Sequence, residues 1–160
     1  NEFHLRFSIE HCTDGYLIVD ELVRNHVQCL LGPTVGGKGK IEARNKTFKA
    51  GQILENAGIT FGLITDAPFV PIEGQLLQAA LYVKNGLSRE MALKCLTINN
   101  AIITDIDSRV GSLEPGKDAD VVIWDVEPLA TLSQVGIVII DGQIAYRRKA
   151  GESNVDYQKL

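Results

Sequence analysis

Apolar and polar side chains alternate over residues 3–9, and this period of two predicts a strand that ends near His11. Residues 27–31 form a short apolar run that stops at a Gly-Pro pair and predicts a second strand. Residues 59–65 are almost continuously apolar, as in a strand that is buried on both faces. Such a strand is typical of a parallel sheet that is covered by helices.

Helical patterns separate and follow these strands. Thr13 is placed to cap a first helix that fades near residue 24, and a second helix runs from about residue 45 to residue 56. After the third strand an apolar stripe predicts a third helix, and Ser88 is placed to cap a fourth. The stripe consists of Leu76, Leu77, Ala80 and Leu81. Strands that alternate with helices in this way predict βαβ units and a parallel sheet.

Beyond residue 106 the helical periodicity stops and an antiparallel pattern begins. Its strongest signal is Asp141-Gly142, a two-residue hairpin turn between two apolar runs. The predicted strands of this part are residues 121–124, 135–140 and 143–146. The predicted organisation is an α/β part over residues 1–106, a small antiparallel part over residues 107–148 and a polar tail over residues 149–160.

Composition and charge exclude several classes of partner. The net charge of -4 and the pI near 5.4 give no basic footprint, so we do not expect a nucleic acid partner. The chain holds no apolar run of about eighteen residues and no signal peptide, so we expect no membrane partner and a cytoplasmic protein. The chain has no initiating methionine and opens within the first predicted strand, which suggests a fragment.

Two aligned strand ends carry the candidate chemistry. Asp66 follows the third predicted strand, at the carboxyl end where α/β folds bind ligands. A carboxylate buried there needs a cation, a metal or hydrogen-bond donors, although an Asp that caps the next loop is an equal alternative. His11 ends the first strand as a candidate metal ligand, with a hydrogen-bonded core histidine as the alternative. His4 and His26 lie elsewhere and are assigned no role.

Two further motifs have simpler interpretations than the sites they suggest. Residues 32–38 have the spacing of a phosphate-binding loop, but Gly39 stands where Ser or Thr would bind magnesium, and Pro33 removes a backbone donor. A flexible loop at the mouth of a pocket is the preferred interpretation. Cys12 beside His11 is excluded as a thiol nucleophile because neighbouring residues on a strand point to opposite faces. All three cysteines are expected to be free, buried thiols.

Three stretches together resemble one known family. Residues 9–13, IEHCT, resemble its histidine motif on barrel strand six, and residues 58–68, GITFGLITDAP, resemble strand eight with its single aspartate. Residues 110–125, VGSLEPGKDADVVIWD, are the most specific and resemble the crossing from the barrel to a small β-domain. The family is the imidazolonepropionase-like branch of the amidohydrolase superfamily, and the resemblance extends to about Arg147.

The resemblance implies a fold and a chemistry. The fold is the last three βα units of a (β/α)8 metal-dependent hydrolase barrel, followed by part of a small antiparallel β-domain. A divalent metal, usually zinc, would lie at the carboxyl end, where Asp66 would bind it and take a proton from its water. His11 would ligate a second metal or orient hydroxide and substrate, so the number of ions stays open. The substrate would be a small amide, a cyclic amide or a dipeptide-like molecule, cleaved at a C–N bond other than a peptide bond.

The departures from the family limit what this chain can do alone. The HxH motif of strand one, the strand-four lysine or glutamate and the strand-five histidine are all absent. Only Asp66 and His11 are available where a metal needs at least three protein ligands, so we expect the isolated chain to be inactive. A complementing N-terminal part or a homo-oligomer is the expected partner. The alternatives are a non-catalytic domain that oligomerises through an exposed sheet edge and, less favoured, a nucleotide-binding protein using residues 32–38.

Overall fold

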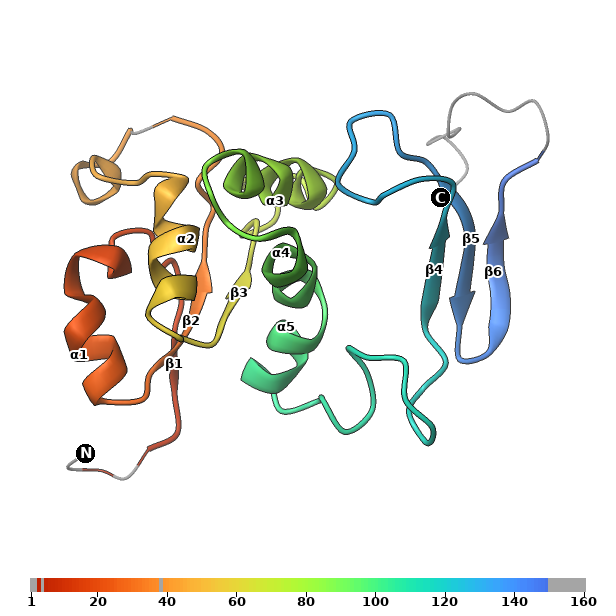
Figure 1. Cartoon of the computed structure of the whole chain (residues 1–160), viewed down its shortest axis with the longest axis horizontal. Coiled ribbons are helices and arrows are strands. Elements are labelled where there is room, and N and C mark those ends of the chain that lie inside the picture. Colours follow the sequence, from red (N-terminus) through yellow and green to blue (C-terminus); the bar gives the residue numbers. More distant parts are fainter. Residues whose placement is uncertain (1–2, 4, 38, 150–160) are drawn as a thin grey trace.

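Two three-stranded sheets organise the chain, one parallel and one antiparallel (Figure 1). The computed structural model describes residues 3, 5–37 and 39–149. The parallel sheet has the order β1-β2-β3, with strands Ser8–Ile9, Gln28–Leu31 and Phe61–Leu63. The antiparallel sheet has the order β4-β5-β6, with strands Val121–Trp124, Val135–Ile140 and Gln143–Arg147.

Helices follow each strand of the parallel sheet, as the sequence pattern predicts. The α-helices are α1 Val19–Arg24, α2 Lys49–Asn56, α3 Gly74–Lys84, α4 Arg89–Leu96 and α5 Ile98–Ile103. Two short 3-10 helices, η1 Gly15–Ile18 and η2 Ile41–Ala43, precede α1 and α2. Figure 1 shows α3, α4 and α5 between the two sheets. Helix α2 packs against α3, and α1, α2, α3 and α4 all contribute residues to one hydrophobic cluster with the parallel sheet. No helix among the described residues is long and apolar enough to cross a membrane.

The core lies between the parallel sheet and its helices. Leu31 and Phe61 of the sheet, Leu54 of α2 and Tyr82 of α3 are fully buried and belong to one hydrophobic cluster. The registers Cys29↔Phe61 and Leu31↔Leu63 place the apolar residues of β2 and β3 side by side. Each such side chain stabilises the fold by about 1.5–3 kcal/mol relative to an exposed position.

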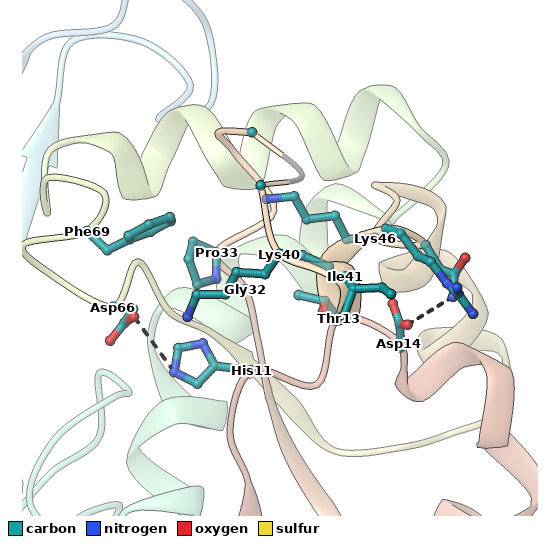
Figure 2. Close-up of a pocket in the computed structure, with 15 residues that line it drawn as sticks. His11, Thr13, Asp14, Gly32, Pro33, Lys40, Ile41, Lys46, Asp66 and Phe69 are labelled. Atoms are coloured by element: carbon teal, nitrogen blue, oxygen red, sulfur yellow. Dashed lines mark hydrogen bonds and ion pairs between the residues drawn. The ribbon is translucent and has the colours of Figure 1, made fainter.

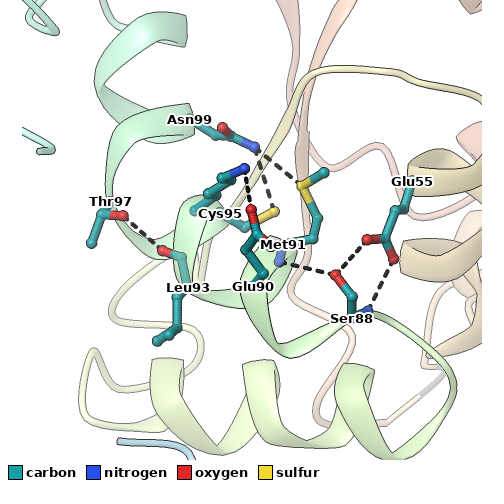
Figure 3. A network of polar contacts seen from close by, with 9 residues as sticks. Glu55, Ser88, Glu90, Met91, Leu93, Cys95, Thr97 and Asn99 are labelled. Atoms are coloured by element: carbon teal, nitrogen blue, oxygen red, sulfur yellow. Dashed lines mark hydrogen bonds and ion pairs between the residues drawn. The ribbon is translucent and has the colours of Figure 1, made fainter.

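Polar contacts fix α4 against its neighbours (Figure 3). The Ser88 hydroxyl accepts a hydrogen bond from Met91 N at 3.1 Å, which confirms the predicted helix cap. Ser88 N donates to Glu55 Oε2 at 2.9 Å, so the same residue ties α4 to α2. The carbonyl of Phe61 accepts from Asn99 Nδ2 at 2.8 Å and from Cys95 Sγ at 3.1 Å. Burial raises the pKa of Cys95 to about 12.

The antiparallel sheet contains the predicted hairpin. Asp141 and Gly142 both have positive φ, 50° and 73°, as the two central residues of a type I′ turn require. An ion pair of 2.9 Å between Arg89 Nη1 and Glu127 Oε2 connects α4 to the segment between β4 and β5. Leu129, from the same segment, packs against the core of the α/β part. The tail predicted for residues 149–160 lies outside the described residues except for Lys149.

Three local predictions are wrong. The first strand covers Ser8–Ile9 only, and Phe3, Leu5 and Phe7 are 74%, 72% and 58% exposed. No described strand pairs with the outer edge of β1, so the alternating apolar side chains have no surface to cover. Thr13 makes no cap, because the turn that precedes α1 is the 3-10 helix η1, which starts after Asp14.

The third error concerns which face of α3 is buried. The predicted apolar stripe is not the buried face: Leu77 is 56% exposed. Gln78, Ala79 and Tyr82 are buried instead, and all three have no exposed area. The physical reason is that the Gln78 amide has hydrogen-bond partners only on the sheet side of α3, where Tyr82 also packs. The hydrogen bonds of Gln78, rather than the apolar stripe alone, therefore decide which face of α3 points toward the sheet.

Candidate functional site

A cavity of about 890 Å³ lies where the three parallel strands end (Figure 2). Each strand contributes to its lining: His11 follows β1, Gly32 and Pro33 follow β2, and Asp66 follows β3. The loop between β2 and α2 forms much of the remaining wall, in agreement with its predicted place at a pocket mouth. The carboxyl ends of parallel strands are the common position for ligand sites in α/β folds.

His11 and Asp66 face one another across this cavity (Figure 2). The distance from His11 Nε2 to Asp66 Oδ2 is 3.8 Å, longer than a hydrogen bond. Both side chains are 50% exposed, so the expected burial of the Asp66 carboxylate is not observed. Both backbones are in the left-handed region, with φ of 53° and 54°. Non-glycine residues seldom adopt this conformation, and such positions cluster at functional sites.

The structural alternatives for these two residues find little support. Asp66 makes no side-chain hydrogen bond to the following loop or to any other described residue, so it does not cap that loop. His11 is exposed at the cavity wall and is not a hydrogen-bonded core histidine. Of the two histidines that were assigned no role, His4 lies outside the described residues and His26 does not line the cavity. The pair is therefore available to an external ligand.

Gln78 holds together two of the strand exits that carry this site. Its Oε1 accepts from Thr34 N at 2.8 Å, and its Nε2 donates to Ile64 O at 2.8 Å. Thr34 follows β2 and Ile64 lies two residues before Asp66, so one fully buried amide joins both segments. Gly32, with φ of 128°, lies where an added Cβ would approach Ile64 O to 2.3 Å. The sequence reading missed Gln78; a polar residue inside an apolar helical stripe was the available signal.

The loop after β2 does not form a phosphate-binding loop. A phosphate loop leads directly into an α-helix whose N-terminus contributes to binding. Here the chain continues to the 3-10 helix η2, and α2 begins only at Lys49. Lys38, the last residue of the motif, lies outside the described residues. The less favoured nucleotide-binding hypothesis therefore lacks its structural basis.

Cys12 does not join the site. Its side chain is 5% exposed and belongs to the hydrophobic core, and its thiol forms a hydrogen bond with that of Cys29. This bond lowers the pKa of Cys12 and raises the pKa of Cys29. All three cysteines are free and buried, which confirms that prediction. The thiols therefore offer no ligand to the His11–Asp66 pair.

The imidazole and the carboxylate of this pair are suitable donors for a divalent cation, but they are only two in number. An imidazole nitrogen and a carboxylate oxygen are ordinary zinc ligands with bonds of about 2 Å, so one ion could bridge the observed gap. Among the described residues no cluster of three or more His, Cys, Asp or Glu side chains could hold a metal. Within the described part of the chain, the site therefore offers two candidate donors, whereas a mononuclear centre requires three.

Known proteins resemble this chain over part or most of its length. An amidohydrolase from Thermotoga maritima has a solved structure with a TM-score of 0.88 and 37% sequence identity, matching 92% of this chain and 38% of that one. The amidohydrolase tasK of Hapsidospora irregularis is 34% identical over 103 residues, 64% of this chain and 10% of the relative. An imidazolonepropionase of Picrophilus torridus is 49% identical over 41 residues, 26% of this chain and 10% of the relative.

These relatives are much longer than the part that matches. The chain spans about a tenth of the two curated relatives and 38% of the Thermotoga structure. The model of the amidohydrolase family matches residues 8–145, which include β1 to β5, most of β6, His11 and Asp66. The family resemblance of the three sequence motifs is thus confirmed, and this chain belongs to the amidohydrolase family.

Proposed function

We propose that this chain supplies His11 and Asp66 to the metal centre of a hydrolase that cleaves a C–N bond of a small amide or cyclic amide. The observation that carries the proposal is the approach of His11 Nε2 to Asp66 Oδ2, 3.8 Å, at the carboxyl ends of β1 and β3, the two parallel strands that flank β2. Membership of the amidohydrolase family and the names of its imidazolonepropionase and adenine deaminase relatives support a reaction at carbon–nitrogen bonds.

The same resemblance supports a finer account of the fold. We infer that β1, β2 and β3 with their helices are the last three βα units of a (β/α)8 barrel, and that β4–β6 are part of the small β-domain. The similarity to the Thermotoga amidohydrolase over 92% of this chain supports this assignment. The missing ligands would then come from a complementing part that carries the other strands.

His11 and Asp66 would have different tasks in such a site. A bound divalent cation, zinc being the expected one, makes a water molecule nucleophilic near neutral pH. Asp66 would accept a proton from the attacking water through a carboxylate oxygen and return it to the leaving nitrogen. His11 would hold the water and the substrate in position through its imidazole, or act as a further metal ligand. Half-exposed side chains at a cavity wall are accessible enough for both roles.

Zinc titration of the chain by calorimetry tests this proposal. The unchanged chain should bind zinc weakly, and Asp66→Asn and His11→Ala should each reduce the affinity by more than about tenfold, since even outer-shell partners contribute that much. His26→Ala and Asp107→Asn are matched controls away from the cavity and should leave binding unchanged. An absence of zinc binding in every form would instead favour the non-catalytic alternative.

A further inference from the structure

The outer edge of β3 has no partner strand among the described residues. Ile64 N donates to Leu31 O at 3.2 Å, so the backbone of Ile64 faces β2. Successive residues of a strand turn their backbone groups to opposite sides, so Phe61 and Leu63 direct their carbonyls away from β2, toward this outer edge. An unpaired row of backbone groups is normally a template on which another strand can pair.

Two side-chain amides occupy the carbonyl of Leu63. It accepts hydrogen bonds from Gln75 Nε2 at 2.5 Å and from Asn100 Nδ2 at 3.2 Å. Gly62 permits this close packing, because an added Cβ there would lie 1.7 Å from Asn100 Oδ1. The oxygens of both amides are buried without a hydrogen-bond partner among the described residues, which costs free energy. The two side chains are therefore held at this edge by the bonds that their N–H groups donate.

The carbonyl of Phe61 is occupied in the same way. Its donors are Asn99 Nδ2 and Cys95 Sγ, and both residues are buried. A carbonyl oxygen has two lone pairs, so neither carbonyl keeps one for the N–H of a further strand. Helices α4 and α5, which carry three of the four donors, pack against β3 (Figure 1). We call the four residues the edge donors: Gln75, Cys95, Asn99 and Asn100.

The opposite edge of the sheet, on β1, is open. No described strand pairs with it, and the side chains of Leu5 and Phe7 are more than half exposed. The segment is anchored through Arg6, which forms an ion pair with Asp105 and donates from Nη2 to Ile102 O at 3.4 Å. Neighbouring residues of an extended chain point to opposite sides, so Leu5 and Phe7 point away from this anchor. The parallel sheet therefore has one closed edge and one open edge.

We propose that the edge donors close β3 against strand addition, so that a second copy of the chain docks only at the β1 edge and assembly ends at a two-fold dimer. A chain with two open edges could add copies head to tail without limit, whereas a single open edge can be shared by two copies only. The inference does not depend on the metal centre. A strand that joins β3 in the proposed barrel would have to replace an edge donor on each carbonyl that it binds.

Sedimentation equilibrium of the full chain up to about 1 mM, which covers weak association, tests the limit of assembly. The average mass should rise toward twice the chain mass of 17.5 kDa and level off there. Gln75→Met with Asn100→Leu preserves the side-chain volume and frees Leu63 O, and this variant should assemble beyond two copies. Gln143→Leu removes an exposed amide from β6 and should stop at two copies.

Three outcomes of this measurement would overturn the inference. They are masses beyond two copies for the unchanged chain, a monomer throughout the concentration range, and an edge-donor variant that keeps its circular dichroism spectrum yet stops at two copies.

A labelled chain tests the closed edge with every edge donor in place. Leu5→Lys with Phe7→Lys blocks β1, because charges on a strand edge oppose pairing, and leaves β3 unaltered. A fluorescent sample of this variant should sediment as a monomer in an excess of unchanged chain, since neither of its edges accepts a strand. Co-sedimentation with the unchanged chain would show that β3 accepts a strand and would reject the inference, whether or not the edge-donor variant folds.

Discussion

At the residue scale, the sequence predicts which side chains lie at strand ends. It does not predict the hydrogen bonds that hold those strand ends in place. Asp66 and His11 could be found because a titratable residue directly follows an apolar run or an alternating strand. Their separation of 3.8 Å depends on which strands are neighbours, which the pattern only implied. Gln78 could not be assigned, because its partners are backbone groups 44 and 14 positions away along the chain. Every residue type other than proline has the same backbone donor and acceptor, so the sequence does not show which residue a side chain bonds through the backbone.

Replacing Gln78 tests how far this amide supports the site. Gln78→Leu keeps the volume but leaves Thr34 N and Ile64 O without their partner in a buried place. Each of the two unsatisfied backbone groups costs about 1–3 kcal/mol, so we expect a loss of about 2–6 kcal/mol in the free energy of unfolding. Urea denaturation followed by circular dichroism measures it. Gln143→Leu on exposed β6 is the control and should change stability by less than about 0.5 kcal/mol. An equal effect of both substitutions would show that the Gln78 hydrogen bonds contribute nothing to stability.

At the element scale, helix starts were predictable where a local signal decides them. Ser88 was identified as a cap because the acceptor and the donor it serves lie three residues apart. Thr13 offers the same residue type and fails, since the chain after it forms a 3-10 turn. The separate helix α5 was not foreseen, as Thr97 interrupts the ladder with φ of -133° without any Gly or Pro. The prediction of which face of α3 is buried was wrong, because the hydrogen bonds of Gln78 turn that residue toward the sheet.

Removal of the Ser88 hydroxyl should weaken the α2–α4 junction. Ser88→Ala removes the cap to Met91 N and the hydroxyl contact with Glu55, and keeps the backbone bond to Glu55 Oε2. A lost cap costs about 1 kcal/mol, and with the second contact we expect a loss of about 1–2 kcal/mol in the free energy of unfolding. Chemical denaturation measures the change.

Ser133→Ala is the matched control for this substitution. The Ser133 hydroxyl is buried without a hydrogen-bond partner among the described residues, so its removal should be neutral or slightly stabilising. A loss for Ser133→Ala equal to that for Ser88→Ala would contradict a specific role of the cap.

At the scale of the whole molecule, the order of strands and helices followed from periodicity, and the two sheets were both foreseen. The length of β1 was not predicted correctly, because a strand at the edge of a sheet forms only where a neighbouring strand pairs with it. Residues 3–9 carry the alternation of a full strand, yet only Ser8–Ile9 pair with β2. The apolar side chains of this alternating segment therefore form a surface that no other described part of the chain covers.

This uncovered edge predicts concentration-dependent self-association. Phe3, Leu5 and Phe7 lie two residues apart, the spacing of one strand face, and are all more than half exposed. Covering such a side chain in a second copy would contribute about 1.5–3 kcal/mol. Sedimentation equilibrium should therefore show an average mass that rises with concentration, and Leu5→Lys with Phe7→Lys should return the chain to a monomer, because charges on an edge oppose pairing. Leu132→Lys, at an 86% exposed site between β4 and β5, should leave the association intact. A monomer at every concentration would reject both the homo-oligomer and the non-catalytic alternative that depends on it.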